Sequence, residues 1–307
     1  SQDALEHTGT STFDAWARQF GDAVTDLEAD ATGKYAAVTR FARFENLPEM
    51  MSRVRQFMDV LNSDQLGAVV KRPDIEGGKP DLITTPMLPA LKAYMDTVLT
   101  PRLEASRRWK PSPQEPNNPD PAVAIITDGR FAALDPRFIG AKIAENAPTK
   151  LNRMADEIIK EYKATTSNVY NDKDGRPMGE PGGTQIVFYN LGFGETSRQN
   201  RGFDSRAALT KRLVAGGVNR DQIAWFDDAD TDAKKGRVFR DMRAGRVRIL
   251  VGSPANMGTG VNVQNRLTAL QYMDPPWFPA DVEQPRGRII RQGNQNPVVR
   301  ENWYATK

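Results

Sequence analysis

The sequence of 307 residues contains no cysteine and a single histidine, His7. Without cysteine the chain can form neither disulfides nor thiolate metal sites, which fits a reducing compartment, and we expect a cytoplasmic protein. One histidine leaves little material for Ser-His-Asp catalysis or a histidine-based metal site, so we expect the chain to bind no metal through its own side chains. No run of about eighteen apolar residues and no signal-peptide pattern occurs, so we expect no membrane partner.

Two motifs that hold nucleotide phosphates and magnesium are also lacking. The sequence has no Gly-x-x-x-x-Gly-Lys-Ser/Thr loop and no Asp-Glu box after an apolar strand. The first residue is serine rather than methionine, and we therefore expect a piece excised from a longer protein. Nucleotide chemistry would then need groups that this chain does not supply.

The composition describes an ordinary globular chain. Apolar residues make up 39% and charged residues 26%, and the formal net charge is +3 with a pI of about 9.0. This mildly basic balance supports a nucleic-acid partner only weakly. The length exceeds that of a typical single domain, so we expect one large unit or two smaller ones.

Short apolar runs alternate with amphipathic segments through the second half of the sequence. The predicted helices are 149–165, 205–215 and 231–244, and the predicted strands are 185–189, 222–226, 247–251, 267–273 and 298–305. Such alternation favours a parallel sheet with helices on both faces. We therefore predict an α/β domain over residues 146–307.

The first 145 residues are expected to be mainly helical. Apolar spacing predicts helices from Phe13 to Leu27, from Pro48 to Leu61 and from Pro86 to Leu103, with a short strand at 81–84. A proline-rich linker lies near 110–121. The tract Asp128-Gly-Arg130 has no evident role, and Arg130 is either functional or a partner for Asp128 or Asp135.

The most informative stretch runs from Gly252 to Gln295. A predicted strand ends in Gly-Ser-Pro and a glycine turn, Gly258-Thr-Gly260, and glycines there permit either close approach to a phosphate, ribose or DNA backbone or simply a tight turn. Further on, Arg288 and Arg291 would project from one face of a helix, because residues three apart are neighbours. Glycines followed by arginines suggest half of a nucleotide site.

An ordered set of residues in this stretch resembles the superfamily 2 helicases, and within them the Swi/Snf-type DNA translocases. The resemblance is closest to the large helicase-like proteins of phages and conjugative plasmids. The matching positions are Ser253, Gly258, Gly260, Asn262, Asp274, Trp277, Gln284, Gly287, Arg288, Arg291 and Gly293. The resemblance implies that residues 146–307 form the second RecA-like lobe and residues 1–145 the inter-lobe region.

The resemblance also implies roles. Arg288 and Arg291 would stabilise the γ-phosphate during ATP hydrolysis, with Gln284 helping to couple the lobes. The remaining assignments are nucleotide contacts by Gly258, Gly260 and Asn262, and lobe coupling by Asp274 and Trp277. ATP and Mg²⁺ would bind to the intact protein, between this lobe and a missing first lobe of the same polypeptide. We expect this fragment alone to bind neither ligand and to lack ATPase activity.

DNA is the expected macromolecular partner. Ser253 and Asn256 could donate hydrogen bonds to DNA phosphates, which position a protein without reading sequence. A basic run around a predicted helix, beginning with Lys234 and Lys235 and continuing to Arg248, is either a solvated face or an electrostatic path for DNA.

Two alternatives of other classes stay open. The lobe could be a non-catalytic module that binds DNA or a partner domain, which Pro285 favours because a proline within the arginine-bearing helix would kink it. It could also be an interaction scaffold within a large phage or plasmid protein, with the helical region as its docking surface.

Overall fold

The computed structural model describes residues 9, 12–29, 35–56, 58–59, 71–113, 115, 117–257, 262–274, 286–287 and 289–307. The chain forms two compact units. Unit 1 comprises Ser1–Val69 and Leu103–Val123, and unit 2 comprises Val70–Arg102 and Ala124–Lys307. Among the described residues, no helix combines the length and the apolar character that crossing a bilayer requires.

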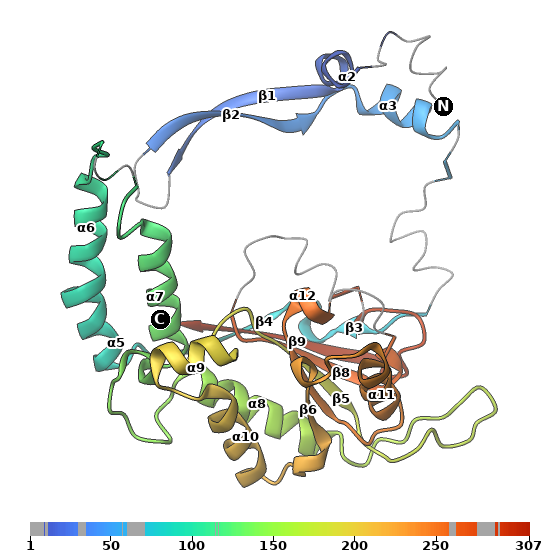
Figure 1. The fold of residues 1–307 in the computed structure, drawn as a ribbon. Coiled ribbons are helices and arrows are strands. Elements are labelled where there is room, and N and C mark those ends of the chain that lie inside the picture. Colours follow the sequence, from blue (N-terminus) through green and yellow to red (C-terminus); the bar gives the residue numbers. More distant parts are fainter. Residues whose placement is uncertain are drawn as a thin grey trace. The chain divides into compact units, whose positions relative to one another are not determined.

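A seven-stranded sheet forms the centre of unit 2 (Figure 1). Its strands are β3 (Asp74–Ile75), β4 (Asp81–Thr85), β5 (Thr184–Phe188), β6 (Ile223–Trp225), β7 (Ile249–Gly252), β8 (Leu267–Tyr272) and β9 (Val298–Thr306). The spatial order is β3-β9-β8-β5-β7-β6, and β4 also pairs with β9, further along that strand than β3 does. All of these pairings are parallel. The predicted α/β class, a parallel sheet flanked by helices, is confirmed.

The strand order reverses beside β5. From β5 the chain moves outward to β6 and returns through β7, and it then crosses to β8 and β9 on the other side. The connections that leave β5 and β8 therefore run in opposite directions. Such a switch point opens a crevice at the carboxyl ends of the strands, where ligands of doubly wound sheets bind.

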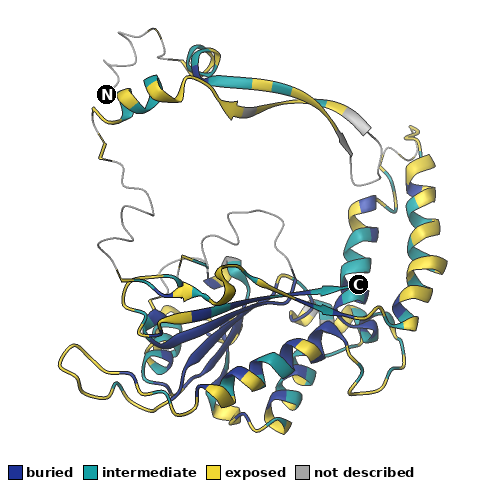
Figure 2. Ribbon diagram, turned by 180° about the vertical axis from the view of Figure 1, so that it is seen from behind, coloured by how far each residue is buried: buried dark blue, intermediate teal, exposed yellow. Residues whose placement is uncertain are grey.

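Helices enclose the sheet in the way that its residue pattern predicts. The helices of unit 2 and its borders are α5 (Pro89–Tyr94), a π-helical turn (Met95–Leu99), α6 (Thr100–Arg108), α7 (Ala122–Leu134), α8 (Lys150–Ala164), α9 (Glu195–Arg201), α10 (Ser205–Ala215), α11 (Asp232–Arg243) and α12 (Pro254–Met257). Successive strand residues belong to different core clusters: Val187 packs with residues of α7, α8 and α10, whereas Ile186 and Phe188 pack with Met242 of α11. Both faces are therefore buried, as Figure 2 shows for the strands.

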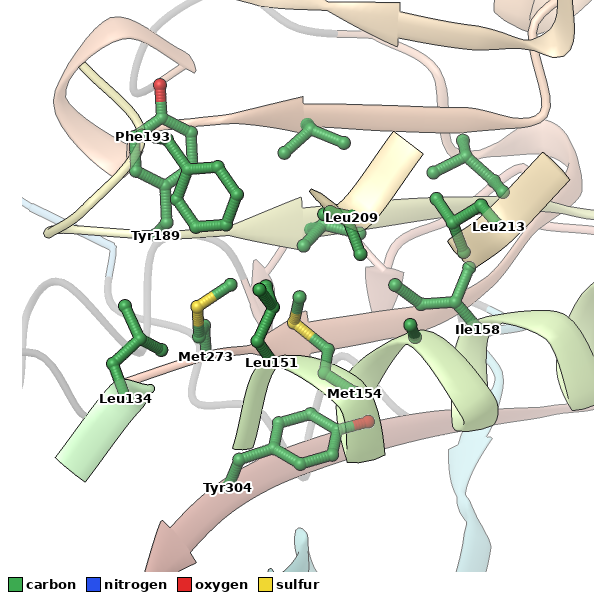
Figure 3. Close-up of a cluster of buried hydrophobic side chains, with 14 of the residues drawn as sticks. Leu134, Leu151, Met154, Ile158, Tyr189, Phe193, Leu209, Leu213, Met273 and Tyr304 are labelled. Atoms are coloured by element: carbon green, nitrogen blue, oxygen red, sulfur yellow. The ribbon is translucent and has the colours of Figure 1, made fainter. Parts of the chain in front are cut away.

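The core under α8 explains how this helix is held. Leu151, Met154 and Ile158 recur at three- and four-residue steps and are fully buried. They meet Leu209 and Leu213 of α10 and the strand residues on that face (Figure 3). At the helix start, the Thr149 hydroxyl accepts a hydrogen bond from the Asn152 N–H at 3.1 Å, which is an N-cap. The predicted helix 149–165 is confirmed to within one residue at each end.

Unit 1 differs from the helical expectation. Its elements include α2 (Phe13–Phe20), β1 (Gly21–Ala29), β2 (Tyr35–Phe44) and α3 (Leu47–Val54), and the two strands form an antiparallel hairpin. The predicted helix from Phe13 to Leu27 is therefore wrong beyond Phe20. Gly21 takes an extended conformation at the helix end, and Val24 then pairs with Arg40 in the hairpin. The apolar spacing of Val24 and Leu27 fitted a helix, but the cross-strand ladder decides the local structure.

The boundaries of the two compact units differ from the domain boundary that the sequence predicts near residue 145. The predicted strand at 81–84 is present as β4, and together with β3 it extends the sheet of unit 2 by pairing with β9. Residues 124–145 likewise belong to unit 2. The division into an inter-lobe region and a helicase lobe near residue 145 stays a prediction.

Candidate functional site

Four polar residues follow the carboxyl ends of parallel strands in unit 2. Tyr189 follows β5, Asp227 follows β6, Ser253 follows β7 and Asp274 follows β8. Because parallel strands end at the same edge of a sheet, these side chains share the edge at which the switch point lies. Sequence patterns pointed to Ser253 and Asp274, whereas Tyr189 and Asp227 carried no motif.

Asn256 belongs to a chain of hydrogen bonds along this edge. Its Nδ2 donates to Asp227 Oδ1 at 2.8 Å, and the Tyr189 hydroxyl donates to the other oxygen of the same carboxylate. Burial raises the pKa of the Tyr189 hydroxyl far above its usual range, and the hydrogen bond to Asp227 adds to this shift. The carboxylate therefore fixes the amide of Asn256, and the hydroxyl of Ser253 accepts from the Asn256 N–H at 3.2 Å.

Asp274 is buried in a small cluster of charges. Its side chain accepts from Arg130 Nη2 at 2.7 Å through Oδ2, and Oδ1 has no hydrogen-bond partner among the described residues. Burial raises the pKa of Asp274, while Arg130 and Lys150 oppose that shift. Lys150 is 7% exposed, and burial lowers its pKa against the attraction of Asp274. Two cations thus face one carboxylate at the switch point.

The structure pairs Arg130 with neither of the two acids, Asp128 and Asp135, that the sequence offered as the alternative to a functional role. Asp135 is instead bound by Arg137, and Asp128 accepts from Arg102 and from Arg201. Arg130 reaches Asp274, which lies 144 positions further along the chain. A local charge pattern cannot reveal a partner at this separation.

The segment that carries the predicted arginines is anchored to β9. Arg286 binds the buried Glu301 carboxylate at 2.8 and 3.1 Å, and Trp303 Nε1 donates to the same carboxylate at 2.9 Å. Ile289 is fully buried, whereas Gly287 and Arg291 are exposed. Arg286 thus has a structural partner, and Arg291 lies on the surface of unit 2.

Two motif segments distant in sequence are hydrogen-bonded to each other. The Gln295 N–H donates to the Asn265 carbonyl at 2.9 Å, and Asn294 Nδ2 donates to the Leu267 carbonyl at 2.9 Å. Gln264 Nε2 also reaches the Gln292 carbonyl at 3.3 Å. The stretch 262–267 and the stretch 291–296 therefore form one local structure.

Several predicted site residues lie outside the described part of the chain. These are Gly258, Gly260, Trp277, Gln284 and Arg288, as well as Pro285. Asn262 is described and exposed, and its backbone carbonyl accepts from Arg243 Nη1 at 3.0 Å.

The first two lysines of the basic run between Lys234 and Arg248 form ion pairs with nearby aspartates. Lys234 pairs with Asp230 at 2.9 Å and Lys235 pairs with Asp232 at 3.7 Å, and all four side chains are exposed. These aspartates reduce the positive potential that DNA would meet at the start of α11. The two lysines stay candidates for DNA contact.

Arg248 does not belong to any such surface. It is 2% exposed, lies over the Tyr162 ring at 3.9 Å, and donates to the Tyr162 and Gly183 carbonyls at 2.7 and 3.0 Å. Gly182, with φ +115°, makes room for it, because a Cβ there would collide with the guanidinium. Arg248 is therefore a core residue, and its inclusion in a DNA path is wrong.

No protein-family model matches this chain, and no curated protein matches it. Similar solved structures include the C-terminal part of the Fun30 ATPase domain, with 13% identity and a TM-score of 0.42 over 77% of this chain and 86% of that one. The Hef helicase domain of Pyrococcus furiosus has 11% identity and a TM-score of 0.43 over 86% of this chain and 62% of that one.

A third similar structure is the ATP-dependent type ISP restriction-modification enzyme LlaBIII bound to DNA, with 12% identity and a TM-score of 0.40. The likeness covers 94% of this chain and 15% of LlaBIII. The chain therefore spans less than two thirds of the length of Hef and of LlaBIII.

Proposed function

We propose that this chain is the C-terminal half of a superfamily 2, Swi/Snf-type, ATP-dependent DNA helicase or translocase. The missing first lobe of the same polypeptide would hold ATP and Mg²⁺. This chain would supply Arg288 and Arg291 to the γ-phosphate and would contact the DNA backbone. The fragment alone would not hydrolyse ATP, because it lacks the phosphate-binding loop and the acidic box.

One observation carries the proposal. The stretch after the glycine turn, 262–267, and the stretch that begins at the second arginine, 291–296, bind each other through Gln295, Asn294 and Gln264. The sequence gives the order of these two stretches along the chain but not their contact in the fold. Their pairing supports a single composite site, in which the glycine turn and the arginines act on one ligand.

The surroundings of Arg291 suit the role of an arginine finger. A finger must project from a rigid support toward a phosphate that another lobe holds. Ile289 is fully buried, and Arg286 is bound to Glu301. Arg291 is exposed, and the described residues include no side-chain partner for it.

ATP hydrolysis by the reassembled protein tests the proposal. The first lobe, or the full-length parent, is combined with this chain, and DNA-dependent turnover is compared between the wild type and Arg291→Ala. Loss of a finger should lower kcat by roughly 10³-fold or more. Lys211→Ala, which removes an exposed cation paired with Glu145 and outside the basic run, serves as the matched control and should keep turnover. Turnover that is indifferent to Arg291 would remove the proposed mechanism.

A binding module without hydrolysis is the second candidate. The pairing of Lys234 and Lys235 with aspartates favours it, because a translocating lobe needs unpaired positive charge along DNA. The ATPase assay above separates the module from the translocase, and DNA affinity measured against salt shows whether the module binds DNA or a protein. A steep loss of affinity with salt supports phosphate contacts, whereas weak and salt-insensitive binding supports a protein partner.

A further inference from the structure

The arginine-bearing turn comprises the described residues from Arg286 to Arg291, and its own side chains hold it at two points. Arg286 binds the buried Glu301 carboxylate, and Ile289 is fully buried in a hydrophobic core cluster of unit 2. Arg291 is exposed and is the last residue of the turn. The direction in which Arg291 leaves the turn therefore depends on how this end is held.

The chain reverses direction directly after Arg291. Gly293 has φ +89°, a conformation that glycine adopts without strain. The reversal is closed by a hydrogen bond from the Asn294 N–H to the Arg291 carbonyl at 3.2 Å. It returns the Asn294 side chain to the end of the turn that the chain has just left.

All four hydrogen-bonding positions of the Asn294 amide are occupied. Its Nδ2 donates to the Leu267 carbonyl at 2.9 Å and to the Ile289 carbonyl at 3.0 Å. Its Oδ1 accepts from the Asn296 N–H at 3.0 Å and from Asn296 Nδ2 at 2.9 Å. Carbonyls only accept and a backbone N–H only donates, so these partners determine which end of the amide is nitrogen. The amide has no position left for a ligand, and its role lies in these contacts.

The contacts of Asn294 join three segments of the chain. Leu267 is the first residue of β8, Ile289 belongs to the arginine-bearing turn, and Asn296 precedes β9. The side chains of Leu267 and Ile289 also lie in the same buried core cluster. Ile289 is thus attached to the sheet twice, by its side chain in the core and by its carbonyl through Asn294. This attachment lies two positions before Arg291.

We propose that Asn294 is a positioning residue for Arg291: its amide ties the Ile289 carbonyl to the start of β8 and thereby sets the direction in which the arginine leaves the turn. The enzymatic consequence rests on the proposed function. The positional consequence does not, and it can be measured on this chain without nucleotide or DNA.

Hydrogen exchange of the 307-residue chain tests the positional part. The reporter is the Ile290 N–H, which donates to the Arg286 carbonyl at 3.0 Å within the turn. Asn294→Leu keeps a side chain of similar shape and removes its hydrogen bonds, so the Ile290 amide should exchange about tenfold faster or more, because the turn opens more easily. Asn294→Asp keeps two acceptor oxygens and removes both donors, and it should have the same effect.

Asn152→Leu is the matched control for this experiment. Asn152 lies in the first turn of α8, and its Nδ2 also donates to two carbonyls, those of Glu145 at 2.9 Å and Ala147 at 2.7 Å. Its loss should disturb a different part of unit 2 and leave the Ile290 amide at its wild-type rate.

Three results of the exchange experiment would overturn the proposal. Unchanged exchange of the Ile290 amide in Asn294→Leu would mean that the turn does not depend on this side chain. Unchanged exchange in Asn294→Asp would mean that the two donated hydrogen bonds do not hold the turn. Equal acceleration in Asn294→Leu and Asn152→Leu would mean that the effect is a general loss of stability.

The reassembled enzyme gives a separate readout. A positioning residue does not touch ATP, so Asn294→Leu should lower kcat about tenfold with KM for ATP within about twofold, whereas Asn152→Leu should keep both constants. An unchanged kcat, with or without a raised KM, would overturn the enzymatic part. If the wild type hydrolyses no ATP, the proposed function fails, and hydrogen exchange alone decides the role of Asn294.

Discussion

Buried arginines hold loops to the sheet of unit 2. Arg248 donates to the Tyr162 carbonyl in the last turn of α8 and to the Thr165 hydroxyl after it, and Arg266 donates to the carbonyls of Glu180 and Met178. A carbonyl left without its donor in the interior costs about 1–3 kcal/mol. These arginines also donate to buried acceptors, the Gly183 carbonyl and Thr165 hydroxyl for Arg248 and the Gly182 carbonyl for Arg266, which explains why two charged side chains are tolerated in the core.

Arg248→Met should lower the free energy of unfolding by about 3 kcal/mol, since the buried Gly183 carbonyl loses the guanidinium donor and the Tyr162 carbonyl keeps only the Thr166 hydroxyl. Urea unfolding measures the change. Arg246→Met is the matched control, because Arg246 is exposed and paired with Asp241. We expect a change below about 0.5 kcal/mol for the control. Equal effects in both variants would contradict the structural role of Arg248.

Lys150 predicts a pH dependence of stability. Burial lowers its pKa in the folded state below the usual 10.5, so as pH rises the folded chain releases this proton before the unfolded chain does. The unfolded state then binds more protons, and the free energy of unfolding rises with pH up to 10.5. Lys150→Met should lack this part of the rise when urea midpoints are compared from pH 7 upward. Lys142→Met, in an exposed loop, should keep it.

At the scale of elements, the turn 286–290 depends on β9. Glu301 is buried and accepts from both Arg286 and Trp303, so the strand presents an anchored carboxylate to the turn. Breaking one side of such a pair leaves a buried charge, whereas removing both sides can be nearly neutral. The Arg286–Glu301 ion pair therefore anchors the turn, and one double variant tests this role.

Arg286→Met should lower the free energy of unfolding by about 3 kcal/mol, because Glu301 stays buried without its cation. In Arg286→Met/Glu301→Leu most of that loss should be recovered. Chemical denaturation of the two variants and the wild type gives the comparison. A double variant that is less stable than the single one would mean that Glu301 has another essential partner.

Elements with strong local signals could be predicted from the sequence, and elements fixed by distant contacts could not. The helix 205–215 and all five strands of the second half follow from apolar periodicity. The hairpin β1–β2 was missed because Val24 and Leu27 also fit a helical period. Helix α7 was missed as well, and the partners of Asp128 and Arg130 come from segments far along the chain. At the candidate site, motifs identified Ser253, Asn256 and Asp274 but not the residues that orient them.

At the scale of the whole molecule, unit 2 is discontinuous in sequence. It takes Val70–Arg102 and Ala124–Lys307, and residues 103–123 belong to unit 1. Strands β3 and β4 come from the first of these pieces and pair with β9 from the second. The sheet edge is therefore complete only when both pieces are present.

A chain of residues 70–307 should retain the sheet, with a free energy of unfolding for unit 2 within about 1 kcal/mol of the full chain. A chain of residues 124–307 should be less stable by about 3 kcal/mol or more, because β9 loses β3 and β4 and exposes an edge. Circular dichroism during urea unfolding compares them. Equal stability of the two shorter chains would show that β3 and β4 add nothing to the sheet.

The place of β9 between β8 and β4 has a consequence for synthesis on the ribosome. Thr85 of β4 and Thr306 of β9 meet across 221 positions of sequence. At translation rates of about 5–20 residues per second, β4 would wait roughly 10–45 s for its partner to emerge. During that time Leu82 and Ile83 have no ladder to join, and the nascent chain is exposed to wrong pairings. We therefore expect chaperones that bind nascent chains at the ribosome to raise the yield of folded protein. The early strand β4 can pair only with β9, which is synthesised near the end of the sequence.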